Sequence, residues 1–198
     1  MKLKKITALL ITSMTFVGLA NAAKPGAYVV GGLGYSQLEN FSDATAKGNG
    51  GLGGMLFAGY NFNRYLGVEA GYRSYAKTNY TVDDFPDLTF DYSMYAFTLV
   101  GKGYLPLGDA SPFNIYVMLG AAQVYGKGNI RLTGTDLFVS NSNNALLATA
   151  GVGVSYNINS HFTTSVEINT TSGRDGDDNH IGIPQSNLAT LNFSYNFS

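Results

Sequence analysis

The stretch that decides the fold is Thr190-Leu-Asn-Phe-Ser-Tyr-Asn-Phe197, near the C-terminal end of the chain. Its large apolar side chains occupy every second position, and small polar side chains fill the positions between them. Successive side chains of a β-strand point to opposite faces of the sheet, so this alternation predicts a strand with one apolar and one polar face. The apolar positions are Leu191, Phe193, Tyr195 and Phe197.

The same period of two recurs in seven segments further upstream. The clearest cover residues 65–75, 95–105, 146–157 and 161–170, and rougher examples cover 26–38, 50–63 and 113–129. No part of the chain after residue 22 supplies the run of about 18 apolar residues that a membrane-spanning helix needs. The chain is therefore predicted to be all-β, with eight strands.

The connections between these segments alternate in length. Short ones lie around 61–64, 107–112 and 157–160, and longer ones cover roughly 39–49, 80–89, 130–143 and 173–187. An even number of strands with short periplasmic turns and longer extracellular loops is the layout of outer-membrane barrels. In lipid every backbone N–H and C=O must be paired, so the sheet has to close. We predict an eight-stranded antiparallel up-and-down transmembrane β-barrel with three short periplasmic turns and four longer extracellular loops.

A soluble β-sandwich or lipocalin-like barrel would alternate as well, and two features disfavour it. Small residues such as Gly71 and Gly153 share a face with charged residues, which suits a narrow polar lumen. Aromatic residues gather near the strand ends, as interfacial girdles do. These aromatic residues are Tyr60, Phe62, Tyr65, Tyr104, Phe113, Tyr116, Tyr156, Phe162, Tyr195 and Phe197.

The first 22 residues have the pattern of a cleaved secretory signal peptide. Lys2, Lys4 and Lys5 precede an apolar run over 6–19, and Ala20-Asn21-Ala22 supplies the small-x-small pattern at which a signal peptidase cuts. We expect cleavage directed by Ala20 and Ala22, followed by a barrel domain over 23–198. Without the three lysines of the signal, the mature chain has nine basic and 13 acidic residues, a net charge of −4. That balance disfavours binding to nucleic acid.

The chain resembles the transmembrane barrel domain of the OmpA-like outer-membrane proteins over nearly all of its mature length. The most specific match is the hairpin Gly59-Tyr-Asn-Phe-Asn-Arg-Tyr-Leu-Gly-Val-Glu-Ala-Gly-Tyr72. Weaker matches in the same order are Leu33-Gly-Tyr-Ser-Gln37, Gly101-Lys-Gly-Tyr-Leu-Pro106, residues 115–120, Gly151-Val-Gly-Val-Ser-Tyr156 and the aromatic C-terminus.

The resemblance implies a place in the cell outer membrane among its lipid and lipopolysaccharide. It also implies insertion by the barrel-assembly machinery, with Leu191, Phe193, Tyr195 and Phe197 as the C-terminal assembly signal. Relatives usually finish on an aromatic residue, whereas Ser198 follows Phe197 here. Many relatives continue into a peptidoglycan-binding periplasmic domain, which we do not expect in this chain.

Four charged residues fall on the polar face of the predicted strands: Glu69, Arg73, Lys102 and Glu167. The resemblance implies an interior ion pair between Glu69 and Lys102. At the places of a second family pair stand Ser155 and Ser165, so Glu167 is expected to be a charged remnant. Such a pair could gate a small pore or plug the lumen. An eight-stranded interior is only wide enough for side chains to fill, which favours the plug.

Ten of the 13 acidic residues lie in the four long segments or at their edges, against five basic residues, a net charge of −5. The acidic residues are Glu39, Asp43, Asp83, Asp84, Asp87, Asp91, Asp136, Asp175, Asp177 and Asp178. The run Asp175-Gly-Asp-Asp-Asn179 lacks the closing Glu of a calcium loop. We predict no metal or cofactor, and the chain has no cysteine for disulfides or thiolate ligands.

Loops on a rigid scaffold are natural sites for binding partners. We therefore expect a structural and surface-interaction role, as an adhesin or through contact with a phage or host surface. A small, poorly conducting pore is the first alternative. A lipid hydrolase is less favoured, because His161 follows a periplasmic turn and His180 has no nucleophile at a telling spacing. The glycine run 48–54 is not followed by the Gly-Lys-Ser/Thr of a phosphate-binding loop.

Overall fold

The computed structural model describes residues 23–39, 44–46, 50–82, 85–108, 111–132, 138–176 and 182–197. The predicted signal peptide, with Ala20 and Ala22, lies outside these residues. His180 lies outside them as well, and so do six of the acidic loop residues: Asp43, Asp83, Asp84, Asp136, Asp177 and Asp178. No helix within the described residues is both long and apolar enough to cross a membrane.

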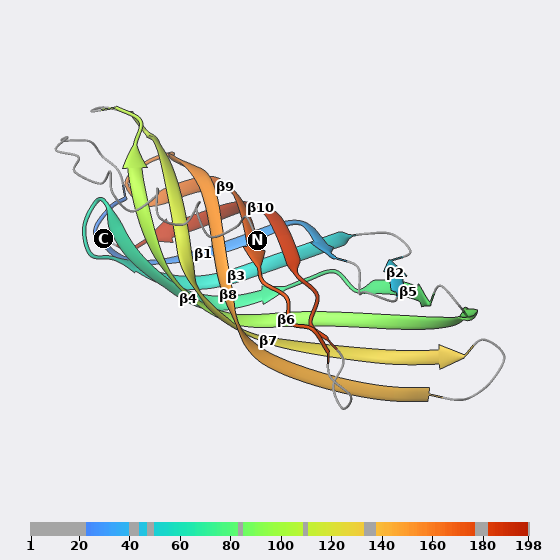
Figure 1. Cartoon of the computed structure of the whole chain (residues 1–198). Coiled ribbons are helices and arrows are strands. Elements are labelled where there is room, and N and C mark those ends of the chain that lie inside the picture. The colour runs from blue at the N-terminus through green and yellow to red at the C-terminus, as the bar shows by residue number, and fades with distance from the viewer. Residues whose placement is uncertain are drawn as a thin grey trace, which may run out of the picture.

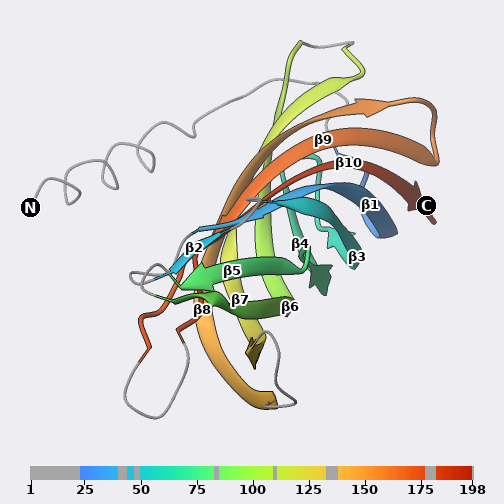
Figure 2. The same ribbon diagram turned by 90° about the vertical axis from the view of Figure 1, so that its right-hand side faces the viewer.

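The strands form one closed antiparallel sheet (Figures 1 and 2). Each barrel strand pairs with its neighbour in the chain, and β1 pairs with β10 to close the circle. The barrel strands are β1 (Gly26–Leu38), β3 (Gly51–Asn61), β4 (Leu66–Ser74), β6 (Phe85–Pro106), β7 (Phe113–Leu132), β8 (Phe138–Asn157), β9 (Phe162–Thr171) and β10 (Ser186–Asn196).

Two short strands extend this frame at the end away from the short turns. β5 (Thr78–Val82) follows β4 after a break at Tyr75–Lys77 and pairs with the same neighbour, β6, so β4 and β5 are two parts of one barrel strand. β2 (Ala44–Ala46) pairs with the free side of β5. The predicted eight-stranded up-and-down barrel is thereby confirmed.

Two of the predicted loops are largely strand. β6 begins at Phe85, and the hairpin of β7 and β8 reaches Leu132 and Phe138, inside the ranges expected to be loops at 80–89 and 130–143. Figure 1 shows these strands running past the others. The alternation of apolar and polar residues is absent there because both faces of the strands are polar, as in Asn141-Ser-Asn-Asn144. A strand outside the lipid needs no apolar outward face, so its alternation disappears.

The outside and the inside of the barrel have opposite chemistry. Outward leucines are well exposed, Leu119 by 71% and Leu146 by 70%, whereas the interior Arg73 and Glu69 are exposed by 0% and 1%. A water-soluble protein would bury the first set and expose the second. The outward apolar band is the surface that a lipid bilayer requires.

The aromatic girdle differs from the prediction at two positions, and a further predicted member, Tyr65, is half-buried in the turn between β3 and β4. Tyr60, Phe62, Phe113, Tyr156, Phe162, Tyr195 and Phe197 are exposed on the outside, near the short turns. Tyr116 instead is buried inside the barrel, and Tyr104 packs against it there, so their assignment to the girdle was wrong. Tyr104 is two residues from Lys102 on β6, and Tyr116 is two residues from Asn114 on β7, so both tyrosines point to the polar inner face.

Candidate functional site

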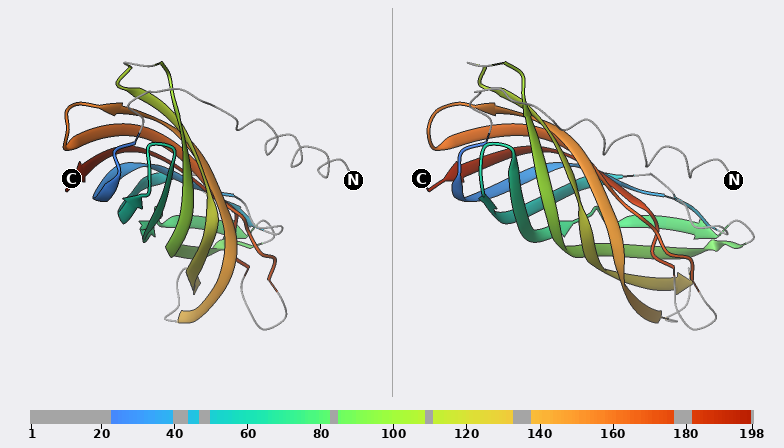
Figure 3. Two further views of the ribbon diagram at one scale, coloured as in Figure 1. Left: turned by 90° about the vertical axis from the view of Figure 1, so that its left-hand side faces the viewer. Right: turned by 60° about the vertical axis from the view of Figure 1, so that its left-hand side comes forward.

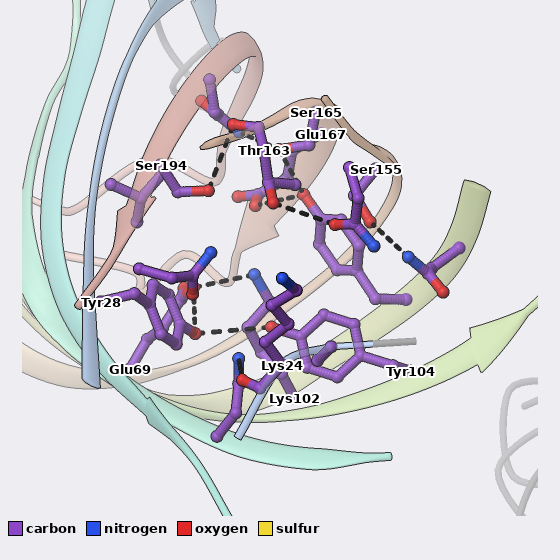
Figure 4. Close-up of a pocket in the computed structure, with 18 of the residues that line it drawn as sticks. Lys24, Tyr28, Glu69, Lys102, Tyr104, Ser155, Thr163, Ser165, Glu167 and Ser194 are labelled. Carbon is purple, nitrogen blue, oxygen red and sulfur yellow. Dashed lines mark hydrogen bonds and ion pairs between the residues drawn. The ribbon is translucent and has the colours of Figure 1, made fainter. Parts of the chain in front are cut away.

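The charged residues of the interior form two layers. Figure 4 shows Glu69 and Lys102 of one layer and Glu167 of the other beside a small cavity. Glu69 and Arg73 project inward from the same strand, β4, four residues apart. A strand rises about 3.3 Å per residue, so the backbone positions of Glu69 and Arg73 are about 13 Å apart along β4. The Glu69 layer is nearer the short turns, and the Arg73 layer is nearer the extracellular end.

The first layer brings Glu69 and Lys102 together. Lys102 Nζ donates to Glu69 Oε1 at 2.8 Å, and the hydroxyl of Tyr28, on β1, donates to the same oxygen at 2.7 Å. Tyr28 Oη lies 3.4 Å from Tyr104 Oη. Three strands, β1, β4 and β6, thus hold one buried carboxylate, which is the hydrogen bonding that a buried charge requires.

The second layer pairs Arg73 with Glu167, across the barrel on β9. Arg73 Nη2 lies 3.3 Å from Glu167 Oε1, and Arg73 Nη1 donates to Thr149 Oγ1 at 3.2 Å. Asn169 Nδ2 also donates to Glu167 Oε1, at 3.2 Å. Glu167, expected to be the charged remnant of a second pair, therefore has a partner in Arg73. This partner lies on the opposite wall and not on a neighbouring strand.

Tyr116 connects the two layers from β7. Its hydroxyl donates to Glu167 Oε2 at 3.0 Å, and its ring centroid lies 4.0 Å from Lys102 Nζ. The face of a tyrosine ring attracts a nearby cation. One side chain therefore contacts the anion of the second layer and the cation of the first. Among the described residues, the four buried charges sum to zero.

Tyr28 and Tyr116 were not among the predicted site residues. Both rings lie against a glycine on the neighbouring strand, Gly59 for Tyr28 and Gly153 for Tyr116. A Cβ at either glycine would meet the ring, so these positions need glycine for the close approach of the ring. The sequence contained one indication of this, because each tyrosine occupies the same alternating positions of its strand as the inward polar residues.

A small cavity lies beside the first layer, toward the short turns (Figure 4). Its volume of about 40 Å³ is enough for a few water molecules. Hydroxyl and amide side chains line it, among them Ser155 and Ser165, which contact Asn114 and Tyr116. The serines that stand at the places of a second family ion pair thus border this cavity.

An apolar cluster fills the interior on the extracellular side of Arg73. Its members lie beyond the two charged layers along their own strands, and Ile183 comes from the segment between β9 and β10. They are Leu38, Tyr75, Tyr92, Met94, Ala96, Ala122, Val124, Ala145, Leu147, Ile183 and Leu188. The sequence predicted a narrow polar lumen, whereas this half is mainly apolar. A few buried hydroxyl side chains, such as Thr78, Thr171 and Ser186, lie among the apolar ones.

The remaining predicted features lie away from this interior. His161 is exposed at the short-turn end, where its Nδ1 is 3.1 Å from the carbonyl oxygen of Asn196 and its ring stacks on Tyr195. Leu191, Phe193, Tyr195 and Phe197 all face outward on β10 and just beyond it. Within the described residues no group of three His, Cys, Asp or Glu side chains is placed to hold a metal ion.

Comparison with solved structures shows the same fold at low sequence identity. The barrel is similar to Neisserial surface protein A, with a TM-score of 0.56 and 19% identity over 87% of this chain and 97% of that one. It is also similar to Ail of Yersinia pestis in complex with the heparin analogue sucrose octasulfate, with a TM-score of 0.53 and 18% identity over 87% and 99% of the two chains. These likenesses concern the fold alone. Figure 3 shows the tilted strands of the barrel from two further sides.

Sequence comparison gives the family. Outer membrane protein A of Shigella flexneri is 28% identical over 200 residues, which cover 98% of this chain and 56% of that protein. This chain thus spans a little over half the length of that relative. The model of the outer membrane protein beta-barrel domain family matches residues 6–197. With its closed barrel, lipid-facing apolar outside and charged inside, the chain belongs to the outer membrane protein beta-barrel domain family and is located in the outer membrane.

Proposed function

We propose that the barrel is a closed anchor that does not conduct, and that it presents its long extracellular strands as an interaction surface. The observation that carries this proposal is the filled interior. Two charged layers and an apolar cluster follow one another along the lumen. The Arg73–Glu167 pair crosses it, and the cluster joins residues from five strands. Eight strands leave an interior just wide enough for side chains.

The apolar cluster is the stronger barrier to ions. An ion moving through it would lose most of its hydration and find only a few hydroxyl groups as partners, which is costly. The cavity near the short turns has only about 40 Å³. These features disfavour the low-conductance pore, the main alternative function, for which the Glu69–Lys102 pair would be the gate.

The interaction surface is carried by β6, β7 and β8, which extend past the apolar band. The polar run Asn141–Asn144 lies on β8 in this extension. Ail was solved with a sulfated heparin analogue. The net charge of −5 in and beside the long connections of this chain disfavours a sulfated ligand and favours a basic partner.

Removing acidic residues from β6 tests the interaction surface. Asp87 and Asp91 are both replaced by Asn, which removes two negative charges and keeps every strand. Cells displaying equal amounts of folded wild-type or variant barrel are applied to immobilised basic and sulfated polymers. We expect the variant to keep its fold and to adhere less to the basic polymer. Equal adhesion by the two barrels would refute the proposed surface.

The hydrolase alternative receives no support from the described residues. The hydrogen bond of His161 to a backbone oxygen and its stacking on Tyr195 give it a structural role at the short-turn end. His180 lies outside the described residues. We expect His180→Ala to leave the lipid composition of the outer membrane unchanged, as lipid mass spectrometry would show.

We also propose that residues 1–22 are removed on export and that the C-terminal strand directs assembly. The outward Phe193 and Phe197, exposed by 60% and 63%, are accessible to an assembly factor before the barrel enters lipid. Phe197→Ala should lower the folded fraction in the outer membrane, whereas Phe62→Ala, an equally exposed control at 63%, should not. Equal losses in both variants would mean that the C-terminus carries no special signal.

A further inference from the structure

The connection between β9 and β10 returns into the extracellular end of the lumen. It runs over residues 172–185, of which 172–176 and 182–185 are described. The outgoing part, 172–176, is exposed throughout, whereas Gly182, Ile183 and Pro184 on the returning part are buried. Ile183 is exposed by only 1% and belongs to the apolar cluster. Its side chain therefore fills part of the lumen from a connection instead of from the barrel wall.

Two sets of hydrogen bonds fix Ile183 in this position. Ile183 and Arg174 form an isolated antiparallel bridge, in which the N–H of each residue donates to the carbonyl oxygen of the other at 2.8 Å. The hydroxyl of Tyr92, a member of the same cluster on β6, donates to the carbonyl oxygen of Gly182 at 3.4 Å. Buried backbone groups need such partners. The returning part is thus bonded both to the outgoing part and to the barrel wall.

The connection is fastened separately from the barrel. The last pair of the β9–β10 ladder joins Thr171 to Ser186, so the contacts of the returning part lie beyond the ladder. At the exposed end, Gln185 Nε2 donates to Glu39 Oε1 at 2.8 Å, and the carbonyl oxygen of Gln185 accepts from Glu39 N at 2.9 Å. A segment with a few contacts of its own can open while the rest of the structure stays folded. Withdrawal of the returning part would break no barrel pairing.

Two residues suit this path into an apolar space. A Cβ at Gly173 would lie 2.7 Å from the backbone nitrogen of Gln185 and 2.9 Å from the carbonyl oxygen of Ile183. Both are backbone atoms that cannot rotate away, so a larger residue at this position would push the returning part aside. Pro184 has no N–H and therefore needs no acceptor where it is buried. The connection is thus built for its returning part to pass close to its outgoing part.

We propose that Gly182–Gln185 is a latch that closes the extracellular mouth of the lumen, with Ile183 as its stopper. The structure holds the latch closed, and opening withdraws Ile183 while all eight barrel strands stay paired. This inference rests on the proposal that the apolar half seals the barrel, and it adds that one part of the seal is removable from outside. Met94, Leu147 and Leu188 belong to the barrel wall and stay in place. An open latch therefore exposes the cluster without making a pore.

Single cysteines test the latch without background, because the chain has no cysteine of its own. Ile183→Cys, Leu188→Cys and Ser172→Cys are displayed on cells at equal amounts and treated with a charged thiol reagent. Ser172 is exposed, and Leu188 is buried in the same cluster on the barrel wall, so they give the fast and the slow limit. We expect Ile183→Cys to react at an intermediate rate. This rate should stop rising at high reagent concentration, because opening then limits the reaction.

Gly173→Ala should release the latch. Combined with Ile183→Cys, it should raise the rate of labelling about tenfold, because the added Cβ crowds the returning part. Combined with Leu188→Cys, it should leave the rate unchanged. Gly101→Ala is the matched control, since its Cβ would meet only the carbonyl oxygen of Leu119, at 3.9 Å, and it should change neither rate.

Hydrogen exchange of the wild-type barrel makes the test independent of the cysteines. The amide of Ile183, bonded to Arg174, should exchange faster than the amide of Leu188 on β10. Equal exchange of the two amides would overturn the latch, as would labelling of Ile183→Cys at the rate of either limit or equal acceleration of both buried cysteines by Gly173→Ala. Conductance of the wild-type barrel would instead contradict the seal itself, so the two failures are distinguishable.

Discussion

The two halves of the barrel interior are closed in different ways. The half nearer the short turns holds four charges in two hydrogen-bonded layers beside a small polar cavity. The extracellular half holds an apolar cluster built from inward residues of five barrel strands, from Tyr75 and from Ile183. The first half has room for water, whereas the second is mainly filled by apolar side chains. Ion pairs therefore join the walls of the barrel, and the apolar half seals it.

Substitutions in the two halves should therefore lower the free energy of unfolding by different amounts. A buried ion pair that loses one partner leaves an unpaired charge in a poorly solvated place, which is more costly than the loss of an apolar contact. The charged layers should therefore dominate stability, and the apolar cluster should dominate impermeability.

The largest effect is expected for Arg73→Ala. Arg73 is fully buried and connects β4 to Glu167 on β9, so its loss should lower the free energy of unfolding by about 3–5 kcal/mol. Urea unfolding of the barrel in lipid vesicles measures it. The exposed pair of Lys77 with Asp91 supplies the control, because Lys77→Ala should cost less than about 1 kcal/mol. Similar losses in both variants would contradict the importance of burial.

Lys102→Ala should cost about 3 kcal/mol, near the lower limit for a broken buried pair, because the cavity beside it lets water reach Glu69. Adding Glu69→Ala removes the unpaired carboxylate, so the double variant should recover part of the loss. The melting temperatures of the three barrels give this comparison. If the double variant lost the sum of the two single effects, the side chains would not interact.

In the apolar half, Leu188→Ala should cost about 2–3 kcal/mol, since Leu188 is fully buried in the cluster. The matched control is Leu146→Ala on the lipid-facing side, where Leu146 is exposed by 70% and lipid can fill the space. Urea unfolding should give a smaller loss for the control. The reverse order would mean that the apolar half is loosely packed.

The smallest effect concerns the link between the layers. Tyr116→Phe removes the hydrogen bond to Glu167 and keeps the ring beside Lys102, so it should cost about 1.5 kcal/mol. Gly153→Ala should cost at least as much, because its Cβ would displace the same ring. Unchanged unfolding midpoints for both variants would exclude Tyr116 as a connection between the layers.

The alternation of residues was sufficient to predict the barrel, because the lipid imposes an apolar outward face on every strand. The juxtaposition of Glu69 and Lys102 also follows from adjacent strands. The pairing of Arg73 with Glu167 does not, since it crosses the lumen between β4 and β9 and depends on strand tilt. The length of β7 and β8 outside the membrane could not be predicted from the sequence. No lipid imposes an alternation of apolar and polar residues on Asn141–Asn144 there.

Single-channel conductance tests the central claim, that the apolar half and not the Glu69–Lys102 pair closes the barrel. Wild type and Lys102→Ala are inserted into planar bilayers at equal amounts and recorded over the same voltages. Both should be silent, because Met94, Leu147 and Leu188 still fill the extracellular half in the variant. Openings in Lys102→Ala that wild type lacks would contradict the account and identify the ion pair as the gate.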